Sequence, residues 1–342
     1  MATAVEFDAV NIVFGERPET ALPLMDAMQD RGSIQAETGQ ILGVHNCSLT
    51  VSEGEILVLM GLSGSGKSTL LRAVNGLNPV IRGAVRVEAG SGLVDVSIAD
   101  PETLRKLRLN RVAMVFQQFG LLPWRTVREN VGLGLELGGM GRAARREKVE
   151  AQLALVGLAD WADRKVGELS GGMQQRVGLA RAFATDAPIL LMDEPFSALD
   201  PLIRTRLQDE LLELQAKLDR TIIFVSHDLD EAFKLGHRIA IMEGGRIVQC
   251  GTPQEIFTHP ATDYVADFVA NMNPLGVLSA RDVAEPLSGI LDVHVDPDAT
   301  IQEVMEAAQG HDAPVGVIEN GTLTGQITRN GILAKLLDPR GR

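Results

Sequence analysis

Cysteine and aromatic residues are scarce in this sequence. Only two cysteines occur in 342 residues, Cys47 and Cys250, and neither lies in a CxxC or paired-histidine spacing. The sequence therefore predicts neither a disulfide framework nor a zinc site, and we expect both thiols to pack as small apolar groups in a reducing compartment. Aromatic residues make up only 4% of the chain, whereas glycine occurs 35 times. We therefore expect turns of the backbone to be more important here than aromatic surfaces on which a ligand stacks.

Long apolar runs and basic charge are also missing. No stretch of about 18 apolar residues occurs, so we do not expect the chain to span a membrane by itself. The N-terminal MATAVEFDAV has no basic segment followed by an apolar one, and no secretory signal is expected. The formal net charge of −13 argues against a nucleic-acid partner. It leaves room for a local anion site built from backbone N–H groups.

The apolar pattern predicts an α/β domain. Ile56–Met60 reads ILVLM, which is typical of a strand buried on both faces, and a glycine-rich loop and a helix from Lys67 follow it. Ile189–Met192 and Ile222–Val225 predict two more such strands. Between these two strands, Leu202–Leu218 is expected to form a helix. Asp200 would be its N-cap and Pro201 its first residue, with an apolar face of Ile203, Leu207, Leu211, Leu214 and Leu218.

Several segments depart from the simple α/β pattern. A first strand is expected to end at Phe14 and a second to cover Leu42–Val51, with Glu16–Gln40 as a polar interruption of short helical character. Helical spacing and many charges over 127–160 predict a helical subdomain at about 120–185. A hairpin of Ile239–Met242 and Ile247–Cys250 is expected near the end of the large domain.

We place the domain boundary after residue 272. Residues 1–272 would form the large domain and 273–342 a small α+β tail. Alternation and turn signals in the tail predict the order βαββα, with an Asn320-Gly321 hairpin turn. The expected elements are Leu291–Val295, Ile301–Ala308, Val315–Ile318, Leu323–Ile327 and Gly331–Leu337.

One glycine-rich string matches GxxxxGK[ST] and stands between a buried strand and a helix. Glycines in such a loop let successive backbone N–H groups surround phosphate oxygens, and the helix N-terminus adds a favourable dipole. Lys67 would bring a positive charge to the outer phosphates, and Ser68 would bind Mg²⁺. The predicted nucleotide-binding residues are Gly61, Leu62, Ser63, Gly64, Ser65, Gly66, Lys67, Ser68 and Thr69.

Two acids follow the apolar strand at 189–192. Acids at the carboxyl end of a strand in an open α/β sheet lie at the crevice where ligands bind. Asp193 is expected to hold Mg²⁺, and Glu194 to orient or deprotonate the attacking water. A solvated strand end is the alternative for these acids taken alone.

A further string, LSGGMQQR at 169–176, completes a family pattern. Together with the loop and the acids, it resembles the nucleotide-binding subunit of an ABC transporter, over nearly all of residues 1–270. The resemblance implies a P-loop NTPase fold of the ABC ATPase type, with ATP and Mg²⁺ bound. MVFQ at 114–117, SALD at 197–200 and VSHD at 225–228 resemble the Q-loop, D-loop and switch-histidine segments.

The resemblance assigns roles to further residues. Gln117 would reach Mg²⁺ or the attacking water, and His227 the γ-phosphate and Glu194. Phe14 stands where an aromatic residue stacks on adenine, although a strand-end or core role is the alternative for it. Trp124 is expected to anchor a short helix of the permease in a groove formed by Gln117–Val127, unless it fills the core of the helical subdomain.

The signature string also predicts a second anion site. Ser170 would cap a helix whose N–H groups bind phosphate, and small residues would allow close approach. In the family this surface meets the P-loop of a partner across a head-to-tail dimer, so a homodimer is implied. The residues assigned to it are Ser170, Gly171, Gly172 and Gln174, with Asp200 in the D-loop at the dimer interface.

The P-loop version and the Glu16–Gln40 insertion resemble one subfamily, the ATPases of importers for quaternary amines such as glycine betaine, proline betaine and choline. Membrane permeases would then be direct partners and a periplasmic or lipid-anchored solute-binding protein an indirect one, with this chain peripheral at the cytoplasmic face of the inner membrane. The tail resembles a single CBS motif, with Asn330 where an acidic ribose contact is often found. Alternatives are an importer ATPase for another small solute and a non-transport ABC ATPase.

Overall fold

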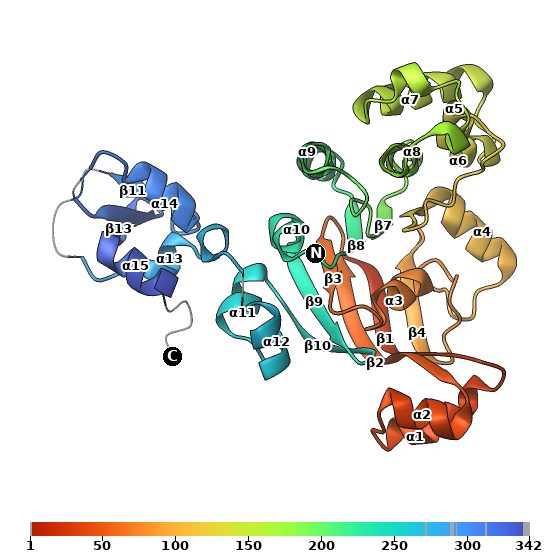
Figure 1. Ribbon diagram of the computed structural model, residues 1–342, viewed down its shortest axis with the longest axis horizontal. Helices are drawn as coiled ribbons and strands as arrows, with labels where there is room; N and C mark the ends of the chain where they lie inside the picture. The colour runs from red at the N-terminus through yellow and green to blue at the C-terminus, as the bar shows by residue number, and fades with distance from the viewer. Residues whose placement is uncertain (1, 271, 288–290, 292, 312, 338–342) are drawn as a thin grey trace. The chain divides into compact units, whose positions relative to one another are not determined.

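The computed structural model describes residues 2–270, 272–287, 291, 293–311 and 313–337 (Figure 1). The chain divides into two compact units, Met1–Val248 and Gln249–Arg342. The functional boundary at residue 272 stays a prediction. No helix in the described ranges combines the length and the apolar character needed to cross a bilayer.

A four-stranded antiparallel sheet of order β2-β1-β4-β5 opens the first unit. At the end of the β1–β2 pair, Phe14 lies opposite Ile41, so the interruption between them leaves and re-enters the sheet at one point. The strands are β1 (Thr3–Phe14), β2 (Ile41–Ser52), β4 (Arg82–Glu88) and β5 (Leu93–Asp95).

A six-stranded sheet of order β10-β9-β3-β8-β7-β6 forms the body of this unit. Its strands β9, β3, β8, β7 and β6 run parallel. Every residue of β3, β7 and β8 is buried, which confirms the three predicted apolar strands. The strands are β3 (Ile56–Met60), β6 (Val112–Val115), β7 (Ile189–Asp193), β8 (Thr221–Val225), β9 (Arg238–Glu243) and β10 (Arg246–Gly251).

Helices connect and cover the strands. α3 (Lys67–Ala73) contacts β2 of the first sheet and β7 and β8 of the second, so the loop before it lies where both sheets meet. α4 (Pro101–Asn110) packs on β6 and α10 (Leu229–Leu235) on β3. α9 (Pro201–Leu218) begins as predicted, with the Asp200 side chain accepting a bond from the N–H of Ile203. The expected apolar face was wrong at Leu218, which is 53% exposed in the last turn.

The helical subdomain contains four helices, of which α8 is the link to the sheet. α8 packs against α5 and α7, which lie near it in Figure 1, and it also contacts β6 of the sheet. Ser170 is its N-cap, as expected, with its Oγ accepting from the N–H of Met173. The helices are α5 (Val127–Val131), α6 (Leu133–Leu137), α7 (Arg142–Leu155) and α8 (Gly171–Phe183), with 3₁₀ turns η2 (Ala159–Trp161) and η3 (Val166–Glu168).

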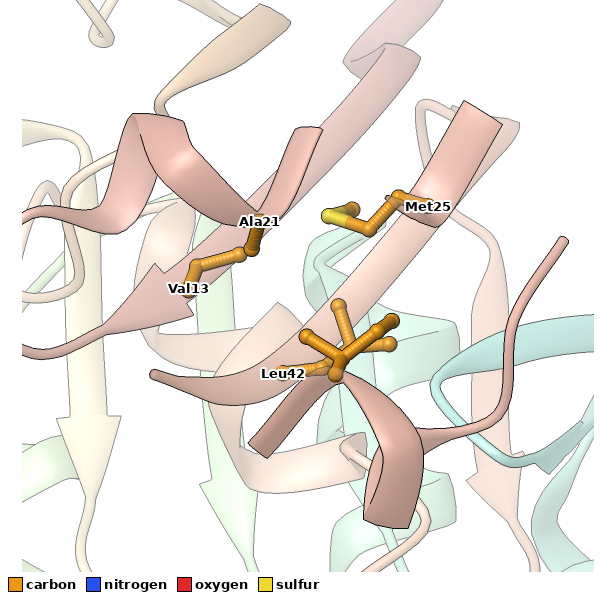
Figure 2. Close-up of a cluster of buried hydrophobic side chains, with 5 residues drawn as sticks. Val13, Ala21, Met25 and Leu42 are labelled. Atoms are coloured by element: carbon orange, nitrogen blue, oxygen red, sulfur yellow. The ribbon is translucent and has the colours of Figure 1, made fainter. Parts of the chain in front are cut away.

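The interruption between β1 and β2 folds into a small helical cap. It contains η1 (Pro18–Ala21), α1 (Leu22–Asp26) and α2 (Arg31–Thr38), and the last of these was not anticipated from the sequence. The cap has its own apolar cluster, in which Ala21, Met25 and Ile34 pack on Val13 of β1 and Leu42 of β2 (Figure 2). All five side chains are at most 5% exposed, so the cap is fastened to the end of the strand pair.

The second unit contains the predicted βαββα order. β11 pairs parallel with β12, and β12 antiparallel with β13 across the Asn320-Gly321 turn. The first strand was expected over Leu291–Val295, which includes residue 292 outside the described set. The elements are α11 (Pro253–Thr258), α12 (Asp263–Phe268), η4 (Pro274–Gly276), α13 (Ala280–Val283), β11 (His294–Val295), α14 (Ile301–Ala307), β12 (Val315–Glu319), β13 (Thr322–Ile327) and α15 (Arg329–Leu337).

Candidate functional site

The loop between β3 and α3 takes a backbone shape that requires glycine. Gly61, Gly64 and Gly66 have φ of 137°, 78° and 103°, in the region that L side chains rarely adopt. Space is short as well, because a Cβ on Gly61 would lie 2.1 Å from the carbonyl oxygen of Met242, and one on Gly66 2.5 Å from that of Gly43. Glycine is therefore required at these positions, and glycine-rich turns of this kind are typical of loops whose N–H groups bind anions.

Lys67 is folded back across this loop. Its Nζ donates to the carbonyl oxygens of Gly61 at 2.8 Å and Leu62 at 3.0 Å. Burial lowers the pKa of Lys67, while the nearby Glu194 and Asp193 carboxylates act in the opposite direction. The ammonium group is thus already positioned at the loop, in a partly desolvated place where its attraction for phosphate is strengthened.

Ser68 and Asp193 bring oxygen atoms together at the end of β7. Ser68 Oγ donates to one Asp193 oxygen at 2.6 Å, and Arg72 binds the other at 2.8 Å. Asp193 is fully buried, and its charge is balanced by this arginine from α3. Ser68 and Asp193, two of the three residues assigned to Mg²⁺ from the sequence, are therefore direct neighbours.

Glu194 lies next to Gln117 and His227. Its Oε2 accepts from Gln117 Nε2 at 3.0 Å and lies 3.5 Å from His227 Nδ1. The residue has a φ of 49°, which is unfavourable for a non-glycine residue and marks a site that the surroundings impose. Its N–H donates to Val225 of β8, so two adjacent strands fix its position.

Gln175 also holds the Glu194 segment in place, and the sequence reasoning missed it. Its Nε2 donates to the Glu194 carbonyl at 3.0 Å, and its Oε1 accepts from the N–H of Ala198 at 2.9 Å. Gln175 is 1% exposed on α8, so the signature helix is joined directly to the loop carrying the acid and the D-loop. The repeated glutamine in the signature string was the only signal available.

Lys67, Ser68, Gln117, Glu194 and His227 line one cleft of about 540 Å³. Phe14, the last residue of β1, stands at one side of it and is 36% exposed, so the buried-core alternative for this ring was wrong and the strand-end alternative stays open. Its ring lies against Gly43, where a Cβ would come within 2.9 Å of it. The lining comprises Phe14, Arg31, Ile41, Leu42, Gly43, Ser63, Gly64, Gly66, Lys67, Ser68, Thr69, Gln117, Glu194 and His227.

Other predicted residues lie outside this cleft. Among the described residues, four predicted site residues adjoin the cleft without lining it, namely Gly61, Leu62, Ser65 and Asp193. Ser170, Gly171, Gly172, Gln174 and Asp200 do not line it either. Gly171 is exposed at the start of α8, and Gln174 Nε2 bonds the Leu169 carbonyl at 3.1 Å. One chain therefore presents a phosphate cradle and, elsewhere, a separate helix N-terminus.

Trp124 is 68% exposed, so the alternative in which it fills the core of the helical subdomain was wrong. The turn that carries it is rigid. Buried Asn130 accepts from the N–H of Leu122 at 2.7 Å and donates to the carbonyls of Leu122 at 3.1 Å and Thr126 at 2.9 Å. The exposed ring is thus displayed by an ordered turn.

Comparison with known proteins agrees with this geometry. Residues 44–197 match the family described as "ABC transporter". The glycine betaine/proline betaine transport system ATP-binding protein ProV of Escherichia coli (strain K12) is 45% identical over 343 residues, covering 100% of this chain and 84% of ProV. The chain belongs to the ABC transporter ATP-binding subunits.

Further similarities of this ABC ATPase extend to other transport systems and to solved structures. The trimethylamine N-oxide transport system ATP-binding protein TmoW of Ruegeria pomeroyi (strain ATCC 700808 / DSM 15171 / DSS-3) is 43% identical, with 95% of this chain and 94% of TmoW covered. A dimeric post-hydrolysis structure of the ATP-binding cassette MJ0796 with ADP and Pi superposes with a TM-score of 0.63 at 30% identity, covering 72% and 98% of the two chains. The predicted ABC ATPase fold is thereby confirmed.

Proposed function

We propose that this ABC ATPase powers an importer for a quaternary amine or a closely related methylated amine, such as glycine betaine, proline betaine or choline. The observation that carries the proposal is the placement of Glu194, with Gln117 and His227 around it, at the edge of a preformed phosphate cradle. The solute class rests on the similarity to ATP-binding proteins of such systems, which covers 100% of this chain for ProV and 82% and 77% of it for two others.

The site supports hydrolysis by an activated water. The loop N–H groups and Lys67 would hold the β- and γ-phosphates, and Glu194 would take a proton from the attacking water. Gln117 would orient that water, and His227 would donate to the γ-phosphate. Phe14 would stack on the adenine, since its ring borders the same cleft.

The residues at the end of β7 suit Mg²⁺. This ion prefers oxygen ligands and is usually held by one or two carboxylates together with substrate phosphates. Ser68 Oγ and the Asp193 carboxylate, 2.6 Å apart, supply such oxygens, with the Gln117 side-chain oxygen as a third. Bound there, the ion would neutralise charge on the phosphates as the γ-phosphate leaves.

A head-to-tail homodimer would complete the site. The exposed N-terminus of α8 at Ser170, Gly171 and Gly172 lies outside the cleft of its own chain, with Gln174 in the first turn of the same helix, so it is free to bind the γ-phosphate held by a second copy. Asp200 would lie at that interface, and Gln175 would connect it to Glu194. The dimeric cassette structures support this arrangement.

The permease would dock beside Trp124. An exposed indole on a turn fixed by Asn130 is a preformed apolar anchor for a short helix of a membrane subunit. The segment also begins at Gln117, which touches Glu194, so docking and hydrolysis are physically connected. The chain would then lie at the cytoplasmic face of the membrane, and a solute-binding protein would act through the permease.

Replacing Trp124 by alanine is expected to uncouple the complex. Solute-stimulated ATP hydrolysis and uptake should fall about 30-fold, since an interface anchor of this kind contributes roughly 2 kcal/mol. The melting temperature and basal hydrolysis of the isolated subunit should not change, because the ring packs on little of its own chain. Trp161→Ala, which removes the other tryptophan of the subdomain, is the control. Normal coupling in Trp124→Ala with a large loss of thermal stability would rule out the docking role.

Uptake by the complete transporter tests the solute class. The subunit is reconstituted with its permease and solute-binding protein, and uptake of labelled choline, glycine betaine, proline betaine and trimethylamine N-oxide is measured with ATP. We expect saturable uptake of at least one of these four that stops in Glu194→Gln. ATP-driven uptake of none of them, with hydrolysis intact, would exclude this solute class and favour an importer for another small solute.

A further inference from the structure

Arg31 reaches the nucleotide cleft from the helical cap. It is the first residue of α2, within the segment that interrupts the β1–β2 pair. Its Nη1 donates to the carbonyl oxygen of Gly64 in the P-loop, and its Nη2 to that of Gly43 on β2 at 2.6 Å. Arg31 also lines the cleft with Lys67 and Phe14. The cap therefore places a guanidinium group at the edge of the phosphate cradle.

The cap holds Arg31 in a fixed place. Asp30 is the N-cap of α2 and accepts from the N–H of Ser33 at 3.1 Å and from its hydroxyl at 2.7 Å. The Ser33 hydroxyl is the main cause that lowers the pKa of Asp30. On the other face of the cap, Met25 and Ile34 are packed against the strands with no exposure. The N-cap bonds of Asp30 and the apolar contacts of Met25 and Ile34 therefore both hold α2, and with it Arg31, in place.

Glycines make room for this side chain on several sides. A Cβ on Gly245, in the β9–β10 turn, would lie 2.8 Å from Arg31 Nη2. Gly245 is held by two backbone hydrogen bonds. Its N–H donates to the Ser65 carbonyl of the P-loop at 3.1 Å, and its carbonyl accepts from the N–H of His45 on β2 at 2.8 Å. The guanidinium thereby joins β2 and the P-loop beside the β9–β10 turn.

Among the described residues, Arg31 makes no ion pair with a carboxylate. Its Nε is buried and has no hydrogen-bond partner among the described residues. No carboxylate is among the causes that shift its pKa, which burial lowers. A partly desolvated cation without an anionic partner is costly, and a polyphosphate in the adjoining cleft would supply the missing negative charge. Arginine presents five N–H donors, and only two are used by the carbonyls.

We propose that Arg31 is a positioning residue for nucleotide binding, which makes the helical cap part of the nucleotide site. By holding the Gly64 carbonyl, it keeps the P-loop turned so that the N–H groups face the phosphates, and its charge adds to that of Lys67. The ligand class is a nucleoside di- or triphosphate, so the inference rests on the proposed function. The residue acts on binding and takes no part in proton transfer.

Nucleotide affinity of the full-length Arg31→Gln protein tests this role. The Kd for ATP should rise about tenfold, the effect of losing hydrogen bonds made by a charged group, whereas kcat at saturating ATP should change little. The rise should shrink at high salt, where the charge contributes less. Arg31→Lys keeps the charge and one of the two bonds, so it should recover part of the affinity. Arg17→Gln, the same change at an exposed position of the cap, is the matched control.

A purely structural role would give a different pattern. Arg31→Gln would then lower the melting temperature while the folded protein bound ATP as the wild type does, and that result would overturn the proposal. If Arg31→Gln does not fold, Arg31→Met decides, because it keeps the apolar stem and removes the charge and the bonds, and wild-type ATP affinity in it would also overturn the proposal. Lys67→Ala is measured in parallel. If Lys67→Ala loses ATP affinity and Arg31→Gln does not, the role of Arg31 is refuted and the nucleotide site stands. Normal ATP affinity in Lys67→Ala would refute the nucleotide site itself.

Discussion

Glu194→Gln is expected to abolish ATP turnover while ATP binding stays intact. The amide has the shape of the carboxylate but cannot accept the proton of the attacking water, and loss of a general base typically costs about 10²–10⁴-fold in rate. The loop should keep its conformation, because backbone bonds to Val225 and Gln175 hold residue 194 in place. Phosphate release at saturating ATP measures the loss. Light scattering should show the variant accumulating as an ATP-bound dimer.

A matched variant separates this effect from a general change of charge. Glu147→Gln removes one exposed carboxylate on α7, which does not line the cleft. This variant should hydrolyse ATP as the wild type does. Turnover of Glu194→Gln within a few-fold of the wild type would remove Glu194 from the role of base. Lost turnover together with lost ATP binding would instead indicate that the cleft had collapsed.

Lys67→Ala is expected to weaken nucleotide binding itself. The proposed site places the ammonium at the phosphates, and its bonds to the Gly61 and Leu62 carbonyls also hold the loop. Losing hydrogen bonds from a charged donor corresponds to roughly a 10- to 100-fold rise in the Kd for ATP. Equilibrium binding of a fluorescent ATP analogue by the isolated subunit measures it.

Lys106→Ala serves as the comparison for this variant. Lys106 forms an exposed helix pair with Glu102 on α4, so its removal should leave nucleotide affinity unchanged. Unchanged affinity of Lys67→Ala at physiological salt would refute the P-loop assignment. Circular dichroism on both variants establishes that the folded protein is being compared.

The parts of the fold that local sequence determines were predictable. Five consecutive apolar residues at Ile56–Met60 could only be a fully buried element, and the glycines after them have the spacing of a phosphate loop. The N-caps Ser170 and Asp200 were likewise readable, since each side chain bonds a backbone group three residues later. In these cases the residues that determine the local structure lie within a few positions of it in the sequence.

The missed features depend on contacts between distant segments. Gln175 and Arg31 bind backbone groups of Glu194, Ala198, Gly43 and Gly64, and a carbonyl or N–H leaves no residue-type signature at the partner position. The helix α2 was recognisable in principle from Asp30 before it and Gly39, with φ of 70°, after it. The error at Leu218 arose because periodicity gives the direction of a helix face and not how far the neighbouring elements extend along it.

The pairing of Phe14 with Ile41 gives the helical cap the character of a module. Because the strands are already side by side where the cap departs, residues between them change the tip of a hairpin and leave the sheet register as it is. Surface additions of this kind are tolerated at little cost in stability. The helical cap carries the Arg31 guanidinium to the edge of the nucleotide cleft. Changes in the cap can therefore alter the affinity for ATP while the geometry of the catalytic residues stays the same.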